Sequence, residues 1–168
     1  MNRRKLDRRQ PIAPASDAAE QSVLGGLLLD NTRLSDVAAV IGEPHFYRDD
    51  HRRIFAHIRN LLEMGRPADV VTVFESIEKS NEVEQAGGLA YLADIANNTP
   101  SAANIVAYAR IVRERAILRD LAACGIAIHG LAVSPGRSDV AAVLKESRDR
   151  VAAVLAEWRG YSSPTVRP

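Results

Sequence analysis

The residues in this sequence that could carry out hydrolytic chemistry gather in one place, at Asp49, Asp50 and His51. Two carboxylates and an imidazole are ligands that hold a divalent metal ion and activate a water molecule. No second group of carboxylates and histidines supports them, and no two histidines stand four residues apart as on a zinc-binding helix. We therefore interpret them as a capped and solvated helix start, with a metal-dependent hydrolase as the alternative.

Other catalytic machinery is weak or absent in the sequence. The three lysines, Lys5, Lys79 and Lys145, do not follow a glycine, so the phosphate loop G-x-x-x-x-G-K-[ST] is missing. Cys124 falls on an apolar helical stripe, which favours a buried inert thiol over a nucleophile. We expect no catalytic, cofactor-binding or metal site in this chain. A single cysteine also indicates a reducing, cytoplasmic environment.

The composition points to a helical globular protein. Hydrophobic residues make up 46% of the 168 residues and charged residues 26%, which excludes wholesale disorder. Aromatic residues are only 5%, so closely packed helices are favoured over a β-sandwich. No apolar run approaches the roughly 18 to 20 residues of a membrane helix, and no apolar segment follows the charged N-terminus as in a signal peptide. We expect an all-α protein with no membrane association.

Apolar residues recur at helical spacing in about five short segments, which predict a globular helical body over residues 16–100. Ser16 or Asp17 can cap the first of these helices. Gly25 and Gly26 lie inside that helix, where each glycine costs about 0.5–1 kcal/mol relative to alanine, so a close contact should compensate. We predict close packing within the chain, with packing against a second chain as the alternative.

One segment of the body, residues 70–74, has an ambiguous pattern. Its β-branched residues favour a strand. Asp69 can cap a helix there, and the sequence offers no second strand to pair with it. We therefore predict a helix.

A long helical hairpin is predicted to follow the body over residues 101–158. Ser101 can cap a helix that reaches to about His129. A loop at 130–138 then leads to a last helix over about 139–158. Two helices joined by a short loop form an antiparallel pair.

The first helix of this hairpin carries two apolar stripes, whereas the last helix carries one seam that can bury only one of them. The other stripe must meet the body or another chain, and near the tip the body is out of reach. We therefore predict self-association through the hairpin. Self-association is assigned to Ile117, Leu121, Ile128 and Leu131, and closing of the hairpin seam to Val140, Leu144 and Val151.

Charge is unevenly distributed along the chain. The first ten residues carry +4 within a basic arm at residues 1–15, whereas the whole chain carries only +1. The mildly acidic remainder argues against direct DNA binding by this domain, and a helical DNA-binding regulator is kept as an alternative. Arg113, Arg115 and Arg119 form a charge-rich helix face, either as surface ion pairs or as a polar contact surface for a partner. Residues 159–168 are expected to form a flexible tail or the start of a linker.

Five stretches of the sequence resemble one family. They are 20–31 (EQSVLGGLLLDN), Phe46-Tyr47 with 51–55 (HRRIF), 87–92 (GGLAYL), 98–105 (NTPSAANI) and 108–115 (YARIVRER). They occur in order, at separations typical of that family, and the similarity covers about residues 15–157. The chain resembles the N-terminal domain of the bacterial replicative DNA helicases of the DnaB type.

The resemblance implies an all-helical body with a globular bundle and a long antiparallel hairpin. Hairpins of this family pair into dimers, which assemble as a trimer of dimers to form the collar of a hexameric ring. The collar receives the C-terminal domain of primase, and a helicase loader is a further candidate partner. The implied role is oligomerisation and primosome assembly in DNA replication.

The resemblance also implies what this chain does not do alone. ATP and Mg²⁺ belong to the family's RecA-like motor domain, which this sequence lacks, so we expect no enzyme activity and no cofactor here. We expect a piece of a longer ATP-dependent DNA helicase, with a stand-alone truncated paralogue as the alternative.

Overall fold

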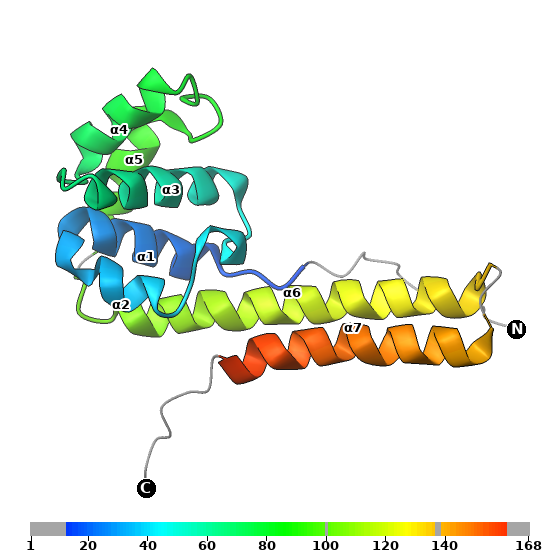
Figure 1. The fold of residues 1–168 in the computed structure, drawn as a ribbon. Helices are drawn as coiled ribbons and strands as arrows, with labels where there is room; N and C mark the ends of the chain where they lie inside the picture. The colour runs from blue at the N-terminus through cyan, green and yellow to red at the C-terminus, as the bar shows by residue number, and fades with distance from the viewer. Residues whose placement is uncertain (1–12, 100, 137–138, 161–168) are drawn as a thin grey trace, which may run out of the picture.

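The computed structural model describes residues 13–99, 101–136 and 139–160, and every regular element in these ranges is a helix (Figure 1). The all-α prediction is therefore confirmed. In chain order the elements are α1 (Asp17–Leu29), η1 (Asn31–Arg33), α2 (Leu34–Ala38), η2 (Glu43–His45), α3 (Asp49–Glu63), α4 (Val70–Lys79), α5 (Gly88–Asn97), α6 (Ile105–Val133) and α7 (Val140–Gly160). The charged part of the predicted basic arm and the tail beyond Gly160 lie outside the described residues.

The body is built around α1, which lies between α3 and α6 and also contacts α5 (Figure 1). The first turns of α6 belong to the same hydrophobic core, because Ile105, Ala109 and Val112 are buried in it. The boundary that we expected between residues 100 and 101 therefore does not separate the core from the hairpin. One continuous helix is packed into the body at its start and projects from it at its end.

Side-chain caps fix two helix starts where the sequence predicted them. Ser16 Oγ accepts a hydrogen bond from the backbone N–H of Ala19 at the start of α1, at 3.4 Å. The Asp69 carboxylate accepts from the N–H groups of Val71 and Thr72, both at 2.9 Å. The backbone hydrogen bond from Thr72 lowers the pKa of Asp69, because it stabilises the ionised carboxylate. The β-branched segment is therefore the helix α4, as predicted.

Gly25 and Gly26 let α1 approach its neighbours more closely than any side chain would allow. A Cβ atom on Gly25 would lie 2.1 Å from Thr99 Oγ1 and 2.7 Å from the Ile95 carbonyl oxygen. A Cβ atom on Gly26 would lie 2.7 Å from Ile105 Cδ1, at the start of α6. The predicted close packing within the chain is confirmed.

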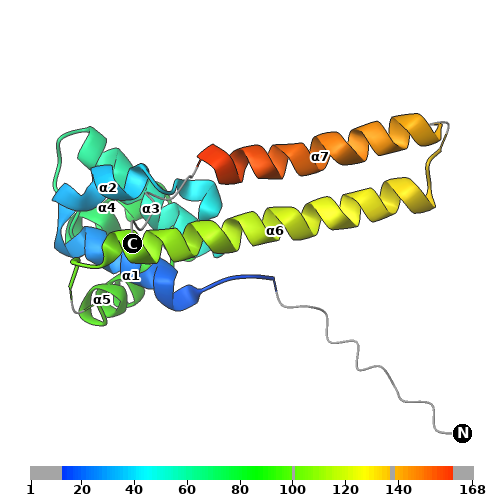
Figure 2. The same cartoon turned by 90° about the horizontal axis from the view of Figure 1, so that it is seen from below.

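Helices α6 and α7 run side by side and project together from the body in both views (Figures 1 and 2). The bounds of α6 correct two sequence-based expectations. Ser101 does not cap it: its hydroxyl accepts from the Ala103 N–H at 3.0 Å, ahead of the helix. The helix also continues past His129, because Gly130 stays helical and its carbonyl accepts from the Ser134 N–H at 3.0 Å.

The loop of the hairpin is consequently shorter than expected, and α7 is longer. The Asp139 carboxylate accepts from the Ala142 N–H at 2.8 Å, where α7 begins. The described part of α7 reaches Gly160, so Arg159 and Gly160 belong to the helix.

Two glycine substitutions test this packing in opposite directions. Gly25→Ala is expected to lower the free energy of unfolding by about 1–3 kcal/mol, because the new methyl group would overlap backbone and side-chain atoms. Gly130→Ala meets nothing within 4 Å and is expected to raise it by about 0.5–1 kcal/mol, because alanine favours a helix interior. Urea denaturation of both variants and the parent measures the two changes. Equal effects of the two substitutions would contradict the packing described here.

Candidate assembly surface

Large apolar side chains remain exposed along one side of the hairpin. The exposed apolar residues of α7 form a stripe along one side of that helix. At 100° per residue, the centre of this stripe lies about 60° around the helix from the side of α7 that contacts α6. Of the exposed apolar residues of α6, Leu118 and Leu121 line a common hollow with Val151, Leu155 and Trp158 of α7. This shared surface, here called the apolar face, consists of Leu118 and Leu121 of α6 and of Val140, Leu144, Val151, Leu155 and Trp158 of α7.

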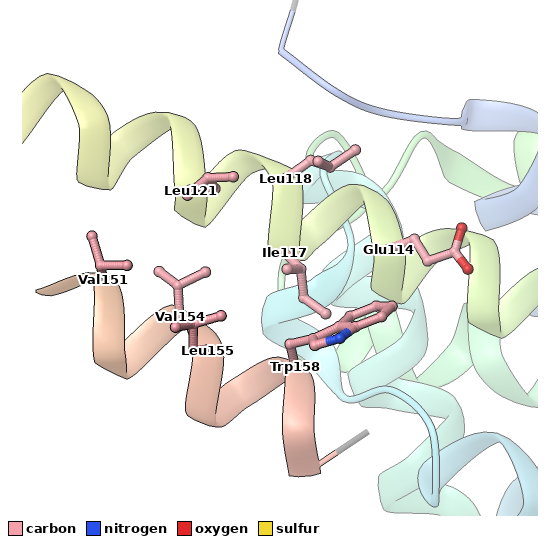
Figure 3. Close-up of a pocket in the computed structure, with 8 residues that line it drawn as sticks. All are labelled: Glu114, Ile117, Leu118, Leu121, Val151, Val154, Leu155 and Trp158. Carbon is pink, nitrogen blue, oxygen red and sulfur yellow. The ribbon is translucent and has the colours of Figure 1, made fainter. Parts of the chain in front are cut away.

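A groove of about 400 Å³ lies on the apolar face near the base of the hairpin (Figure 3). Ile117 of α6 and Trp158 of α7 approach each other across it, and Val151 and Val154 point from α7 toward α6. Its lining is almost entirely apolar, with Glu114 at the edge. Burial of such a groove against another apolar surface is favourable by about 25 cal/mol for each Å² of apolar area removed from water.

The residues of the predicted hairpin seam differ in how far they are exposed in the single chain. Val140 and Leu144 are 75% and 65% exposed, and they border a second hollow of about 280 Å³ at the tip. Val151 lines the groove at the base and is 37% exposed. The least exposed residues of α7 are Val143, Ser147 and Val154. The apolar stripe of α7 is wider than the contact between α7 and α6. One edge of the stripe packs against α6, and the other edge stays exposed.

The residues assigned to self-association lie at different depths in the hairpin. Ile117 is buried at the α6–α7 contact, and Ile128 and Leu131 are half-buried there. Leu121 is 48% exposed on the apolar face. Cys124 is buried on the stripe between them, as the sequence predicted. Which of these residues meet a second chain stays a prediction.

Arg119 forms contacts within the chain. Its guanidinium donates to the carbonyl oxygens of His45, at 2.6 Å, and Pro14, at 2.9 Å. It also lies over the ring of Tyr47, 5.4 Å from the centroid. Burial lowers the pKa of Arg119, because the charged form is desolvated. Arg119 therefore fastens α6 to the η2 segment and to the residues that lead into α1.

Arg113 is likewise engaged within the chain. Its guanidinium forms an ion pair with Glu157 of α7 at 2.9 Å, and its side chain is only 14% exposed. Of the three predicted partner-surface arginines, Arg115 is the exposed one. Whether Arg113, Arg115 and Arg119 contact a partner stays a prediction.

The region of Asp49, Asp50 and His51 does not form a metal site. Among the described residues, no three His, Cys, Asp or Glu side chains are placed to hold a metal ion. Asp49 and Asp50 accept hydrogen bonds from the neighbouring Arg53 and Arg48, both at 2.9 Å. Burial raises the pKa of Asp50, but the hydrogen bond and charge of Arg48 together with the contacts of His51 outweigh this effect, so the pKa is lowered.

His51 is completely buried, so the expectation of a solvated helix start is wrong for this residue. Its Nδ1 lies 2.6 Å from Glu20 Oε2, and its Nε2 lies 2.7 Å from the Tyr91 hydroxyl. Glu20, also buried, accepts a further hydrogen bond from the Tyr47 N–H at 2.7 Å. A neutral imidazole satisfies both contacts, with Nδ1–H donating to Glu20 and the Tyr91 O–H donating to Nε2. The network ties α1, α3 and α5 together.

A second histidine contact links α3 to the end of α4. His57 Nδ1 lies 2.8 Å from Ser76 Oγ, and its Nε2 lies 3.0 Å from Glu82 Oε2. The hydrogen bond from His57 lowers the pKa of Glu82, and Arg53 adds to the effect. This arrangement is structural, because both histidine nitrogens are occupied by protein groups.

Helix α6 corrects the expectation about apolar runs. Within the described part of the chain it is the one helix long and apolar enough to cross a membrane, with a mean hydropathy of 1.6 over an 18-residue stretch. A helix that packs against other helices passes the same test, and the first turns of α6 lie in the core of the body. Only 17% of that stretch is buried in the single chain.

The fold is therefore a helical body that projects a long antiparallel hairpin with exposed apolar side chains. Residues 12–114 match the family model of the DnaB-like helicase N-terminal domain. The chain belongs to that family, which confirms the resemblance found in the sequence.

Relatives support this assignment over most of the chain. The replicative DNA helicase DnaB of Haemophilus influenzae is 41% identical over 152 residues, which are 90% of this chain and 32% of that protein. The replicative DNA helicase DnaB of Mycobacterium leprae is 38% identical over 145 residues, which are 85% of this chain and 24% of that protein. The chain thus spans a third or less of the length of these curated relatives.

Two solved structures share the fold. The crystal structure of the N-terminal domain of DnaB helicase from Mycobacterium tuberculosis superposes with a TM-score of 0.80 and 34% identity, covering 84% of this chain and 99% of that one. A DnaB-like replicative helicase, described with its interactions with primase, superposes with a TM-score of 0.67 and 19% identity. The superposition covers 84% of this chain and 31% of that one, and at this sequence identity it shows only that the two chains share a fold.

The buried network can be tested by removing one hydroxyl. Tyr91→Phe should lower the free energy of unfolding by about 1–3 kcal/mol, because His51 Nε2 would remain buried without its hydrogen bond. Tyr108→Phe is the matched control, since Tyr108 is half-buried and no hydrogen bond of its hydroxyl is found in the described residues. Urea denaturation of both variants measures the difference. A loss in Tyr91→Phe no larger than in Tyr108→Phe would contradict the role of the network.

The Glu82 contact predicts a pH dependence of stability. The pKa of Glu82 is lowered in the folded chain, so this residue stabilises the fold above its unfolded pKa of about 4.5 and stops doing so as the pH falls through the folded value. Glu82→Gln should therefore reduce stability at pH 7 and make it less steeply dependent on pH below 4.5. Urea denaturation across pH 3 to 7 measures this, with Glu146→Gln as the control. Parallel pH curves for the parent and Glu82→Gln would contradict it.

Proposed function

We propose that this chain is the oligomerisation and primase-interaction domain of a replicative DNA helicase, acting in DNA replication and primosome assembly in the cytoplasm. The observation that carries the proposal is the apolar face of the hairpin. The large apolar side chains exposed along the hairpin gather around two hollows, and clusters of exposed apolar residues mark protein–protein contacts.

The partner in self-association is a second copy of the chain. The apolar face extends from Val140 to Trp158 on α7, which is about 27 Å of helix at 1.5 Å per residue. Two such faces packed together would form a bundle of four helices with a shared apolar core. In the proposed assembly, dimers formed in this way combine as a trimer of dimers to build the collar of the hexameric ring.

The second partner is the C-terminal domain of primase. A structural relative of this chain is described with its interactions with primase, and most of the chain shares its fold. Helicase activity, ATP and Mg²⁺ would belong to the motor domain of the longer protein, since this chain contains no phosphate loop.

Leu121→Asp tests self-association. A carboxylate placed at the centre of a buried apolar contact should weaken association by about 3 kcal/mol or more. Sedimentation equilibrium should therefore show a lower mass than for the parent, while circular dichroism shows the same helicity. Met64→Asp is the control, because Met64 is an exposed apolar residue on the body at the end of α3. An unchanged mass for Leu121→Asp would reject the assignment of this face.

Titration calorimetry of the chain with the C-terminal domain of primase tests the second partner. Saturable binding with a defined stoichiometry is expected. An associated chain that does not bind primase would overturn this part of the proposal and favour a paralogue with another partner. A chain that neither associates nor binds primase would overturn both parts.

A further inference from the structure

A polar cluster at the base of the hairpin joins three parts of the chain. The Glu157 carboxylate on α7 lies 2.9 Å from Arg113 Nη2 on α6 and 3.4 Å from Nε2 of His45 in η2. Arg113 Nη1 lies 2.7 Å from the same His45 nitrogen, and its Nη2 also donates to the Glu157 carbonyl oxygen at 3.4 Å. A single cluster therefore connects the body, α6 and α7.

The body side of this cluster is held firmly. A neutral His45 ring that donates from Nδ1 to the Gly42 carbonyl oxygen, 3.1 Å away, leaves Nε2 to accept from Arg113. Arg119 holds the His45 carbonyl oxygen at 2.6 Å. The Arg113 side chain is mostly buried, whereas Glu157 is 43% exposed. Glu157 is therefore the member of the cluster that is free to leave when α7 moves.

The end of α7 is weakly anchored by apolar packing. No described residue of α7 is buried, and its large apolar contacts are with α6. Trp158 is adjacent to Glu157 and stands half-exposed over the groove (Figure 3). Elements with few buried contacts open at low free-energy cost, so a polar contact near their end has a large effect on their position.

We propose that Glu157, Arg113 and His45 form a latch that holds the C-terminal end of α7 against the body and keeps Trp158 over the groove. Its opening moves the end of α7 and reshapes the apolar face. A partner that binds Glu157 or Arg113 shifts the hairpin from the latched to the released state, by its different affinity for the two states. This regulatory role rests on the proposed function, because the apolar face is the proposed assembly surface. The latch itself does not depend on the proposed function.

Hydrogen exchange of the full chain tests the latch. Glu157→Gln keeps the size of the side chain and removes its charge. Amide exchange in peptides covering 150–160 should become about fivefold faster, the effect of losing a partly exposed ion pair of about 1 kcal/mol. Glu146→Gln is the matched control, because among the described residues this α7 carboxylate pairs with Arg150 of its own helix, at 2.7 Å. Exchange in α1 and α3 should be the same in both variants.

A double-mutant comparison separates the latch from a general loosening of the helix. Arg113→Gln should speed exchange at 150–160 by the same factor, and the double variant should be no faster than either single variant. Equal exchange in Glu157→Gln and Glu146→Gln, or additive effects of Arg113→Gln and Glu157→Gln, would overturn the latch. Sedimentation of the same samples keeps the two proposals apart: a monomeric parent whose α7 is released by Glu157→Gln contradicts self-association and supports the latch.

Discussion

The close approach of α1 to α5 and α6 is the constraint on which the rest of the structure depends. Gly25 and Gly26 remove the side chains that would separate these helices, so Thr99 and Ile105 pack directly onto the α1 backbone. This contact fixes the direction of α6 at its first turn. Because α6 is continuous from Ile105 to Val133, the same contact also sets the direction in which the hairpin leaves the body.

The body and the hairpin are stabilised in different ways. The body has a closed core reinforced by buried hydrogen bonds, of which the Glu20–His51–Tyr91 network is the most buried. The hairpin has two helices in contact along one edge, with an apolar face left open beside that contact. The polar contacts of Arg113 and Arg119 hold the base of the hairpin to the body. A firm support that presents an incompletely buried surface is the arrangement expected of an assembly domain.

Periodicity and local capping predicted most of the helices. Asp69 decided between helix and strand for α4, because a capping carboxylate acts on amide groups only two and three residues away. Helix ends that depend on competing local interactions were predicted less well. The Ser101 hydroxyl accepts a hydrogen bond within a turn ahead of α6, so Asn104 and not Ser101 is the N-cap residue of the helix. Gly130 lies inside α6 and does not end it.

Interactions between distant segments could not be predicted from the sequence. His51 meets Glu20 and Tyr91, which are 31 and 40 residues away, and only the folded body brings them together. A signal existed in Glu20, which stands three and four residues before Val23 and Leu24 on the buried side of α1. The degree of exposure along the seam could not be predicted, because a helical stripe shows which residues are apolar, but not how far the neighbouring helix is rotated from the centre of the stripe.

The central claim is that the apolar face of the hairpin is the surface through which copies of this chain assemble. Hydroxyl-radical footprinting across a dilution series, with the mass measured at each concentration, tests it most directly. As the mass rises, the side chains of Leu121, Leu144 and Trp158 should lose reactivity, while Met64 on the body should keep it. A chain that stays monomeric at all concentrations, or that associates with no protection of these three side chains, would contradict the claim.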